Sequence, residues 1–185
     1  MPFRLFYRGP LKSNGKLKDK HEIRLKFHPQ LADLWKQERM NGFATYLTKY
    51  PKDTGEISIL YTVGEREYAC LVSDRLKIYA ELDILFLRPS EPGQILIKGD
   101  IDNRLKTLFD ALQRPQNENE APKNDLLSQT PNPCHCVLSE DSLISRVSVT
   151  TDTLLDAKND DEVVLIITVT VIASRTINGN IGYMH

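Results

Sequence analysis

The feature that most constrains the fold is a long run of alternating residues between positions 75 and 87. Apolar side chains occupy every second position of this run, at Leu76, Ile78, Ala80, Leu82, Ile84 and Phe86. A period of two places these side chains on one face of a β-strand. That face needs an apolar layer to cover it, so the run predicts a central strand that packs against a helix.

The segment from 101 to 112 has the spacing of such a helix. Its apolar residues recur at intervals of three and four positions and form one face, made of Ile101, Leu105, Leu108, Phe109 and Leu112. The opposite face carries Asp102, Lys106 and Asp110, each four residues from the next. Asp100 stands at the expected cap position. The sequence therefore predicts an amphipathic helix that begins with two aspartates.

The remaining segments complete an α+β pattern. Alternation or β-branched composition predicts strands at 3–7, 22–27, 143–150 and 162–173, a hairpin at 56–63 and 67–72, and a short helix at 29–35. The 162–173 strand is expected to be buried on both faces. The segment 113–137 has neither a helical nor a strand period and is expected to be a long inserted loop.

These elements predict one domain over residues 1–173, followed by a flexible C-terminal tail at 174–185. A single domain also suits the length of 185 residues, which is enough to bury a real core. The expected architecture is a mixed, mostly antiparallel sheet with helices packed on one face.

The composition excludes several classes of protein. No apolar run is long enough to cross a bilayer, and the first residues lack the apolar core of a secretory signal, so we expect a cytoplasmic protein with no membrane partner. Three cysteines are an odd number and predict no disulfide framework. Cys134, His135 and Cys136 lack the second ligand pair of a structural zinc site.

The two aspartates at the start of the predicted helix have two interpretations. Aspartate is a preferred helix cap, acidic side chains in a first turn complement the helix dipole, and Asp102 with Lys106 has the spacing of an ordinary helical ion pair. Alternatively, Asp100 and Asp102 bind Mg²⁺, which proteins hold with one or two carboxylates plus water and phosphate. Lys106 would then face that phosphate. A third carboxylate elsewhere would favour the metal site.

A candidate third carboxylate lies in the acidic pair at 140–141, directly before the predicted 143–150 strand. The order of these features resembles the RusA-type endodeoxyribonucleases, which are Holliday-junction resolvases. That family carries an aspartate-x-aspartate-asparagine motif, a lysine four residues after the second aspartate, a helix that ends near Asp-Ala-Leu, and an acidic pair before a strand. The matching residues are Asp100, Asp102, Asn103, Lys106, Asp110, Ala111, Leu112, Glu140, Asp141 and Ser142.

The resemblance implies a metal-dependent endonuclease that resolves four-way DNA junctions in recombination and repair, and a RusA-like fold. Asp100, Asp102 and Asp141 would bind Mg²⁺ or Mn²⁺, and Lys106 would complete the catalytic set. Asn103 and Glu140 would support these groups. Two symmetric cuts in a junction need two active sites, so the resemblance also implies a homodimer.

The distribution of charge bears on DNA binding. The formal net charge is −1, yet residues 1–40 carry ten lysines and arginines against four aspartates and glutamates. Such a basic segment can bind phosphates, or it can be a solvated face. The candidate nucleic-acid-binding residues are Arg8, Lys12, Lys16, Lys18, Lys20, Lys98 and Arg104.

Two alternatives to a nuclease stay open. A non-catalytic nucleic-acid-binding or interaction module of the same fold would suit the near-neutral charge, the glutamate at 140 and the long 113–137 segment. A purely structural role of the aspartates as helix caps predicts that Asp100→Asn and Asp102→Asn cause only small losses of stability. The nuclease interpretation is favoured because three separate segments of the chain agree with it.

Overall fold

The computed structural model describes residues 1–49, 57–90 and 100–174, without the side chain of Asp100. The strands are β1 (Pro2–Pro10), β2 (Leu60–Val63), β3 (Arg66–Val72), β4 (Ile78–Arg88), β5 (Cys134–Leu138), β6 (Ile144–Thr153) and β7 (Glu162–Ala173). The α-helices are α1 (Leu17–Trp35), α2 (Asp100–Leu112) and α3 (Asp125–Gln129). Short 3-10 helices are η1 (Glu38–Leu47), η2 (Asp74–Leu76) and η4 (Asp141–Leu143).

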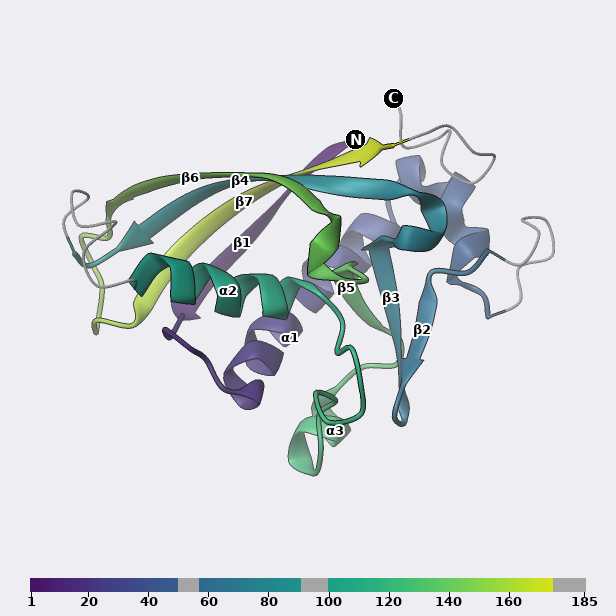
Figure 1. Cartoon of the computed structure of the whole chain (residues 1–185), viewed down its shortest axis with the longest axis horizontal. Coiled ribbons are helices and arrows are strands. Elements are labelled where there is room, and N and C mark those ends of the chain that lie inside the picture. Colours follow the sequence, from purple (N-terminus) through teal and green to yellow (C-terminus); the bar gives the residue numbers. More distant parts are fainter. Residues whose placement is uncertain (50–56, 91–99, 175–185) are drawn as a thin grey trace.

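The strands form two mixed sheets (Figure 1). The larger sheet has the order β1-β7-β4-β6, and the smaller has the order β2-β3-β5. Pairing is antiparallel for β1 with β7, β7 with β4, and β2 with β3, and parallel for β4 with β6 and β3 with β5. The predicted α+β class with a mostly antiparallel, mixed arrangement is therefore confirmed, although two sheets replace the one expected.

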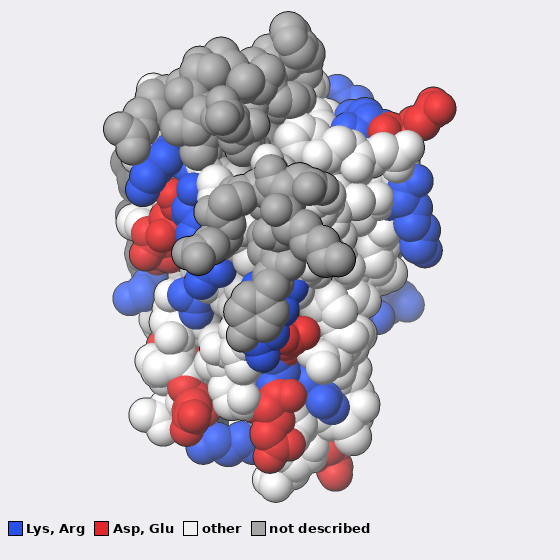
Figure 2. Space-filling model, turned by 90° about the vertical axis from the view of Figure 1, so that its right-hand side faces the viewer, with Lys and Arg blue, Asp and Glu red and all other residues white. Residues whose placement is uncertain are grey.

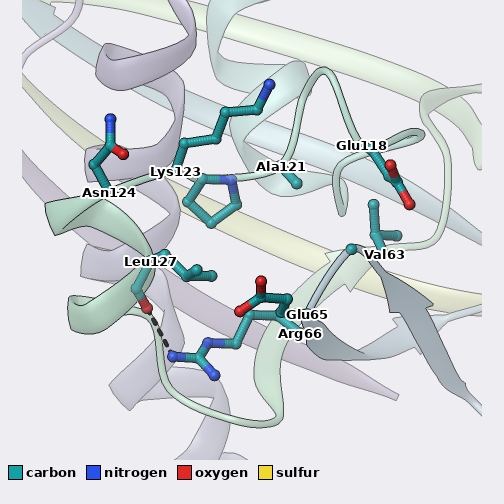
Figure 3. Close-up of a pocket in the computed structure, with 10 residues that line it drawn as sticks. Val63, Glu65, Arg66, Glu118, Ala121, Lys123, Asn124 and Leu127 are labelled. Atoms are coloured by element: carbon teal, nitrogen blue, oxygen red, sulfur yellow. Dashed lines mark hydrogen bonds between the residues drawn. The ribbon is translucent and has the colours of Figure 1, made fainter.

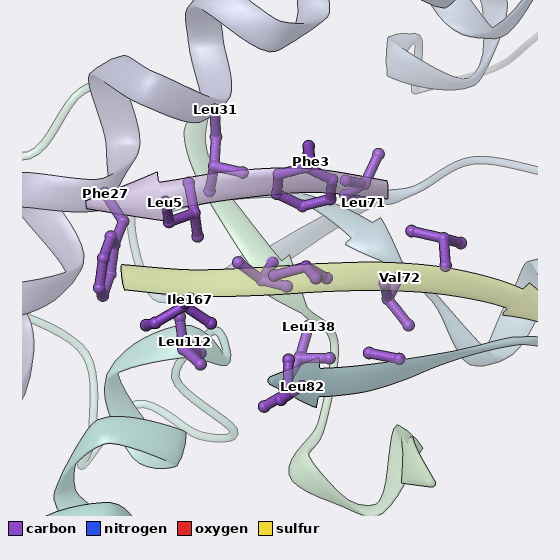
Figure 4. Packing of buried hydrophobic residues seen from close by; sticks show 14 of the residues in the cluster. Phe3, Leu5, Phe27, Leu31, Leu71, Val72, Leu82, Leu112, Leu138 and Ile167 are labelled. Atoms are coloured by element: carbon purple, nitrogen blue, oxygen red, sulfur yellow. The ribbon is translucent and has the colours of Figure 1, made fainter. Parts of the chain in front are cut away.

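Helices α1 and α2 lie on the same side of the large sheet (Figure 1). The apolar face of β4 that the alternating pattern predicted is buried at all five of its strand positions, Ile78, Ala80, Leu82, Ile84 and Phe86. These residues share one core with Phe27 and Leu31 of α1 and Leu112 of α2 (Figure 4). The sequence pattern therefore identified the central strand and the side on which its helices pack.

The other face of the large sheet is open within the described residues. Ile166 and Ile172 of β7 are 37% and 36% exposed, and Phe6 of β1 is 53% exposed. The expectation that β7 is buried on both faces was therefore wrong. A continuous run of β-branched residues is also compatible with a strand whose second face reaches solvent, because apolar atoms make up much of any protein surface.

Residues 22–27, predicted as a strand, lie inside helix α1. Ile23 and Phe27 are buried along with Leu31 and Leu34, at intervals of three and four residues that define one helical stripe. Ile23, Leu25 and Phe27 also alternate over this short stretch, so the sequence pattern was assigned the period of a strand instead of that of a helix. Pro29, predicted at the first helical position, lies within this helix.

The segment 113–137 is more ordered than the predicted loop. It contains helix α3 and strand β5, which pairs in parallel with β3 from Tyr68 opposite Cys134 to Val72 opposite Leu138. A five-residue strand is too short to show a clear period, and its partner β3 is distant in sequence.

No helix among the described residues is long and apolar enough to cross a membrane. The expected tail lies outside the described residues apart from Ser174.

Candidate functional site

The start of helix α2 presents a charged face to solvent. Asp102 and Lys106 are exposed and Asn103 is half-buried, whereas Ile101 and Leu108 are buried on the opposite side. Within the described residues, neither Asp102 nor Lys106 forms an ion pair or a side-chain hydrogen bond, so the simple helical ion pair between them is not formed. The backbone of Asp100 lies in the first turn of the same helix.

The loop before α1 is fixed against this end of α2. The backbone N–H of Gly15 donates to Oγ1 of Thr107 at 2.9 Å. A Cβ atom at position 15 would lie 2.5 Å from Cγ2 of Thr107, so the close approach requires glycine. This contact holds the loop that carries Lys12 and Lys16 against α2 at Thr107, one residue beyond Lys106.

Several of the predicted basic residues are already paired with carboxylates. Nζ of Lys12 lies 2.8 Å from Asp19, an interaction that raises the pKa of Lys12 and lowers the pKa of the Asp19 carboxyl. The other pairs are Lys18 with Glu22, Lys20 with Asp110, and Arg8 with Asp156 and Glu162. Lys16 forms no ion pair within the described part of the chain, and Lys98 lies outside it.

Arg104, predicted to contact nucleic acid, is instead buried. Only 9% of the residue is exposed, and its Nη1 donates to the backbone oxygen of Leu11 at 2.7 Å. Its Nη2 lies 3.5 Å from Oδ1 of Asp161. The guanidinium therefore ties α2 to the end of β1 and to the segment before β7, and it is not placed to bind a phosphate.

Asp141, predicted to join Asp100 and Asp102, lies at the opposite end of α2. Its backbone N–H donates to Oε1 of Gln113, the residue that follows the helix. Between Asp102 and Gln113 the helix axis advances about 16 Å, at roughly 1.5 Å per residue. Figure 1 shows η4 near the C-terminal end of α2. The carboxylates of Asp102 and Asp141 therefore do not converge on one metal ion.

The sheet register gives the physical reason for this separation. Strands β4 and β6 pair in parallel, with Ala80 opposite Ile144 and Arg88 opposite Thr153. Asp141 precedes β6 and thus lies near the beginning of β4, whereas α2 starts after β4 has ended. The predicted grouping of Asp141 with Asp102 is therefore wrong, because parallel pairing places the start of β6 beside the beginning of β4 and not beside its end.

The C-terminal end of α2 is held by a buried network from α1. Arg24 donates from Nε to the backbone oxygen of Gln113 at 2.8 Å and from Nη2 to that of Asp110 at 2.7 Å. Its Nη1 lies 3.2 Å from Nδ1 of His21, whose Nε2 lies 2.8 Å from Oγ1 of Thr130. Burial, followed by the nearby Arg24 charge, lowers the pKa of His21 to about 4. The terminal carbonyls of α2 are therefore satisfied by a cation.

An arginine-lined pocket of about 420 Å³ lies beside this end of α2. Its walls include Tyr61 of β2, Arg75 of η2 and Arg114, the second residue after α2. The guanidinium carbons of Arg75 and Arg114 lie 4.0 Å and 4.6 Å from the centroid of the Tyr61 ring. We refer to it as the arginine pocket. These residues come from three separate segments with no common spacing, so no sequence pattern predicts that they meet.

A second pocket, of about 600 Å³, surrounds the tip of the β2–β3 hairpin (Figure 3). Glu65 and Arg66 approach it from the hairpin, and Lys123 and Glu118 approach it from the segment after α2. Two positive and two negative side chains thus line it. The face of the molecule in Figure 2 likewise mixes Lys and Arg with Asp and Glu among the described residues. Neither surface has the single sign of charge typical of a phosphate site.

The cysteines do not form a metal site with the neighbouring histidine. Cys134 and Cys136 are buried in one cluster with Cys70, and all three are free thiols. The ring of His135 instead stacks on His28, with centroids 5.4 Å apart. Successive residues of a strand point to opposite faces, which explains why His135 is separated from the two thiols.

Mg²⁺ fits only part of the predicted ligand set. Within the described residues, no group of three or more His, Cys, Asp or Glu side chains is arranged to hold a metal ion. The pair that remains is Asp100 and Asp102, which lie in the first turn of α2, and two carboxylates are a sufficient protein ligand set for Mg²⁺. Comparisons with protein-family models, curated proteins and solved structures gave no match.

Proposed function

We propose that the protein is a Mg²⁺-dependent endonuclease acting on branched DNA, with the reaction at the start of helix α2. The observation that carries this proposal is the pair Asp102 and Lys106 on one exposed helix face, beside the loop that Gly15 anchors. Neither side chain is engaged by an ion pair among the described residues, so both are available to a metal ion and a phosphate. The resemblance to junction resolvases supplies the substrate class, a four-way junction.

In this proposal Asp100 and Asp102 hold the metal, with Mn²⁺ as a substitute for Mg²⁺. The bound ion would polarise a phosphodiester oxygen and lower the pKa of a bound water. Asn103 would orient a carboxylate through its amide. Lys106 lies one turn further along the same face, where its ammonium offsets the charge that grows on the phosphate in the transition state. Two coordinated cuts need two such sites, so the proposal includes a homodimer.

A second candidate function is a nucleic-acid-binding module that does not cut. The position of Asp141 favours it, because the separation of about 16 Å along α2 removes one of the three predicted ligands. In this alternative the aspartates act as helix caps and the protein binds DNA without a metal-dependent reaction.

Cleavage of a labelled synthetic four-way junction distinguishes the two functions. Wild type and Asp102→Asn are incubated with and without Mg²⁺, and a linear duplex serves as the control substrate. The nuclease proposal expects paired, symmetric nicks that need Mg²⁺ and are absent from Asp102→Asn, whose affinity for the junction is retained. Binding by wild type without nicks in either Mg²⁺ or Mn²⁺ would reject the nuclease and favour the module.

A further inference from the structure

We propose that the arginine pocket binds a phosphodiester group of a nucleic acid, away from the proposed reaction site. The inference rests on the proposed function for the choice of nucleic acid as the ligand. The need for an anion follows from the pocket itself. Neither Arg75 nor Arg114 forms an ion pair with a carboxylate within the described residues, although both guanidiniums lie close to one aromatic ring.

The separation of the two guanidiniums suits a single phosphate. Because their carbons lie 4.0 Å and 4.6 Å from the same ring centroid, the two groups are within about 9 Å of one another. A phosphate placed between them can accept hydrogen bonds of about 2.8 Å from both. Arg114 also has a buried Nε without an acceptor among the described residues. Two adjacent guanidiniums that form no ion pair among the described residues are stabilised by a bound anion.

The pocket is preorganised by contacts that leave part of each guanidinium available. Nη1 of Arg75 donates to the backbone oxygens of Ser58 and Leu60, and Nη1 of Arg114 donates to that of Pro115. The ring of Tyr61 is fixed because its hydroxyl donates to Oδ1 of Asp74 at 2.6 Å. Neither arginine therefore has to be ordered when a ligand binds, which lowers the entropic cost of binding.

Two carboxylates lie near the pocket, and neither forms an ion pair with Arg75 or Arg114 among the described residues. Oδ1 of Asp74 accepts hydrogen bonds from the hydroxyls of Tyr61 and Ser139, and these bonds lower the pKa of Asp74 against the effect of burial. Glu118 lines the wall but forms no ion pair with either arginine. The lining charges are thus two positive and one negative, in contrast to the balanced pocket of Figure 3.

The position of the pocket relates it to the proposed reaction site. Arg114 lies about 18 Å beyond Asp102 along the direction of α2, at roughly 1.5 Å per residue. A DNA strand advances about 3.4 Å per phosphate along the helix axis. A phosphate in the arginine pocket would therefore be about five steps from one at the start of α2, so the pocket would position the arm of a branched substrate.

The test is the affinity for a fluorescein-labelled four-way junction, measured by anisotropy in EDTA so that cleavage plays no part. Wild type is compared with Arg75→Gln, Arg114→Gln and the double variant over a range of salt concentrations. Arg146→Gln is the matched control, because Arg146 is exposed on β6 and already paired with Glu81 and Asp83. Arg75→Lys and Arg114→Lys retain the charge, and thermal unfolding verifies that each variant folds.

We expect the double variant to bind about tenfold or more weakly, with a salt dependence shallower by about one unit in the slope of log K against log salt. The lysine variants should keep that slope, and Arg146→Gln should match wild type. An unchanged affinity and slope in a folded double variant would overturn the inference. Inorganic phosphate is the second probe: if it stabilises wild type but not the double variant while DNA affinity is unaffected, the site takes free phosphate rather than nucleic acid. Because no metal is present, loss of cleavage cannot be mistaken for loss of this site.

Discussion

The two ends of helix α2 are built in opposite ways. At the start, Asp102 and Lys106 point into solvent without ion pairs among the described residues, beside a loop held by one hydrogen bond to Thr107. At the end, the buried Arg24 of α1 donates to the carbonyls of Asp110 and Gln113 and contacts His21, and the arginine pocket lies nearby. The start of α2 therefore leaves charged side chains accessible to a ligand, whereas buried hydrogen bonds hold the end of α2 in a fixed position.

The sequence predicted elements whose patterns are local. The alternation at 76–86 identified β4, and the spacing from Ile101 to Leu112 identified α2, because each period is set by the geometry of the element itself. Residues 22–27 were misassigned because Ile23, Leu25 and Phe27 satisfy a period of two over a stretch too short to exclude a helix. Only the continuation through Leu31 and Leu34 distinguishes the helix.

The candidate site was predictable at one end of α2 only. Asp102 and Lys106 are four residues apart, so helical spacing places them on one face, and Asp100 lies in the same first turn. The position of Asp141 depends on the parallel pairing of β5 with β3 and of β6 with β4, which no local pattern reveals. The arginine pocket joins Tyr61, Arg75 and Arg114 from three segments and needed the three-dimensional structure for the same reason.

The largest expected effect is the loss of junction cleavage when divalent cations are removed, because only the start of α2 is proposed to need a metal ion. Removal of divalent cations with EDTA should abolish junction cleavage, because the proposed reaction needs a polarised phosphate and an activated water. Junction binding in EDTA should persist, since the arginine pocket needs no metal. Gel assays of cleavage and anisotropy of binding on the same samples measure both quantities. Cleavage that persists after complete chelation would show that the reaction needs no divalent cation.

A smaller effect is expected from Lys106→Gln at the start of α2. Loss of a positioned cation that stabilises transition-state charge costs roughly 100-fold in rate. Single-turnover cleavage rates at saturating junction give this value directly. Lys36→Gln is the control, because Lys36 is exposed on the surface and pairs with Asp33. If the two variants cleave equally fast, Lys106 has no role in the reaction.

The other end of α2 should respond to pH through His21. Its pKa is about 4 in the folded state, against about 6.5 when unfolded, because burial disfavours the charged ring and the nearby Arg24 guanidinium adds to this effect. The unfolded chain therefore binds more protons between these values, so stability is full above pH 6.5 and falls as the pH drops towards 4.

Urea unfolding of wild type and His21→Gln at several pH values isolates this contribution, because other buried histidines such as His135 are common to both proteins. Each unit of pKa difference corresponds to about 1.4 kcal/mol. The stability of wild type should fall more steeply than that of His21→Gln between pH 6.5 and pH 4. Parallel curves would show that His21 is not held neutral.

The smallest expected effect concerns the anchor at the start of α2. Thr107→Val keeps the volume of the side chain but leaves the buried N–H of Gly15 without its acceptor. This change should lower the free energy of unfolding by about 1–3 kcal/mol. Equilibrium denaturation gives the value, with Thr107→Ser as the control that retains the hydroxyl. An equal loss in both variants would mean that packing of the methyl group, and not the hydrogen bond, holds the loop.

The central claim is that metal chemistry belongs to the start of α2 alone. It is tested most directly by junction cleavage rates of Asp102→Asn and Asp141→Asn, measured side by side in Mg²⁺ at saturating DNA. The proposed site predicts that Asp102→Asn is inactive while Asp141→Asn retains most of the wild-type rate, because Asp141 lies a helix length away. Equal and complete loss of cleavage in both variants would contradict this separation and place all three carboxylates in one site.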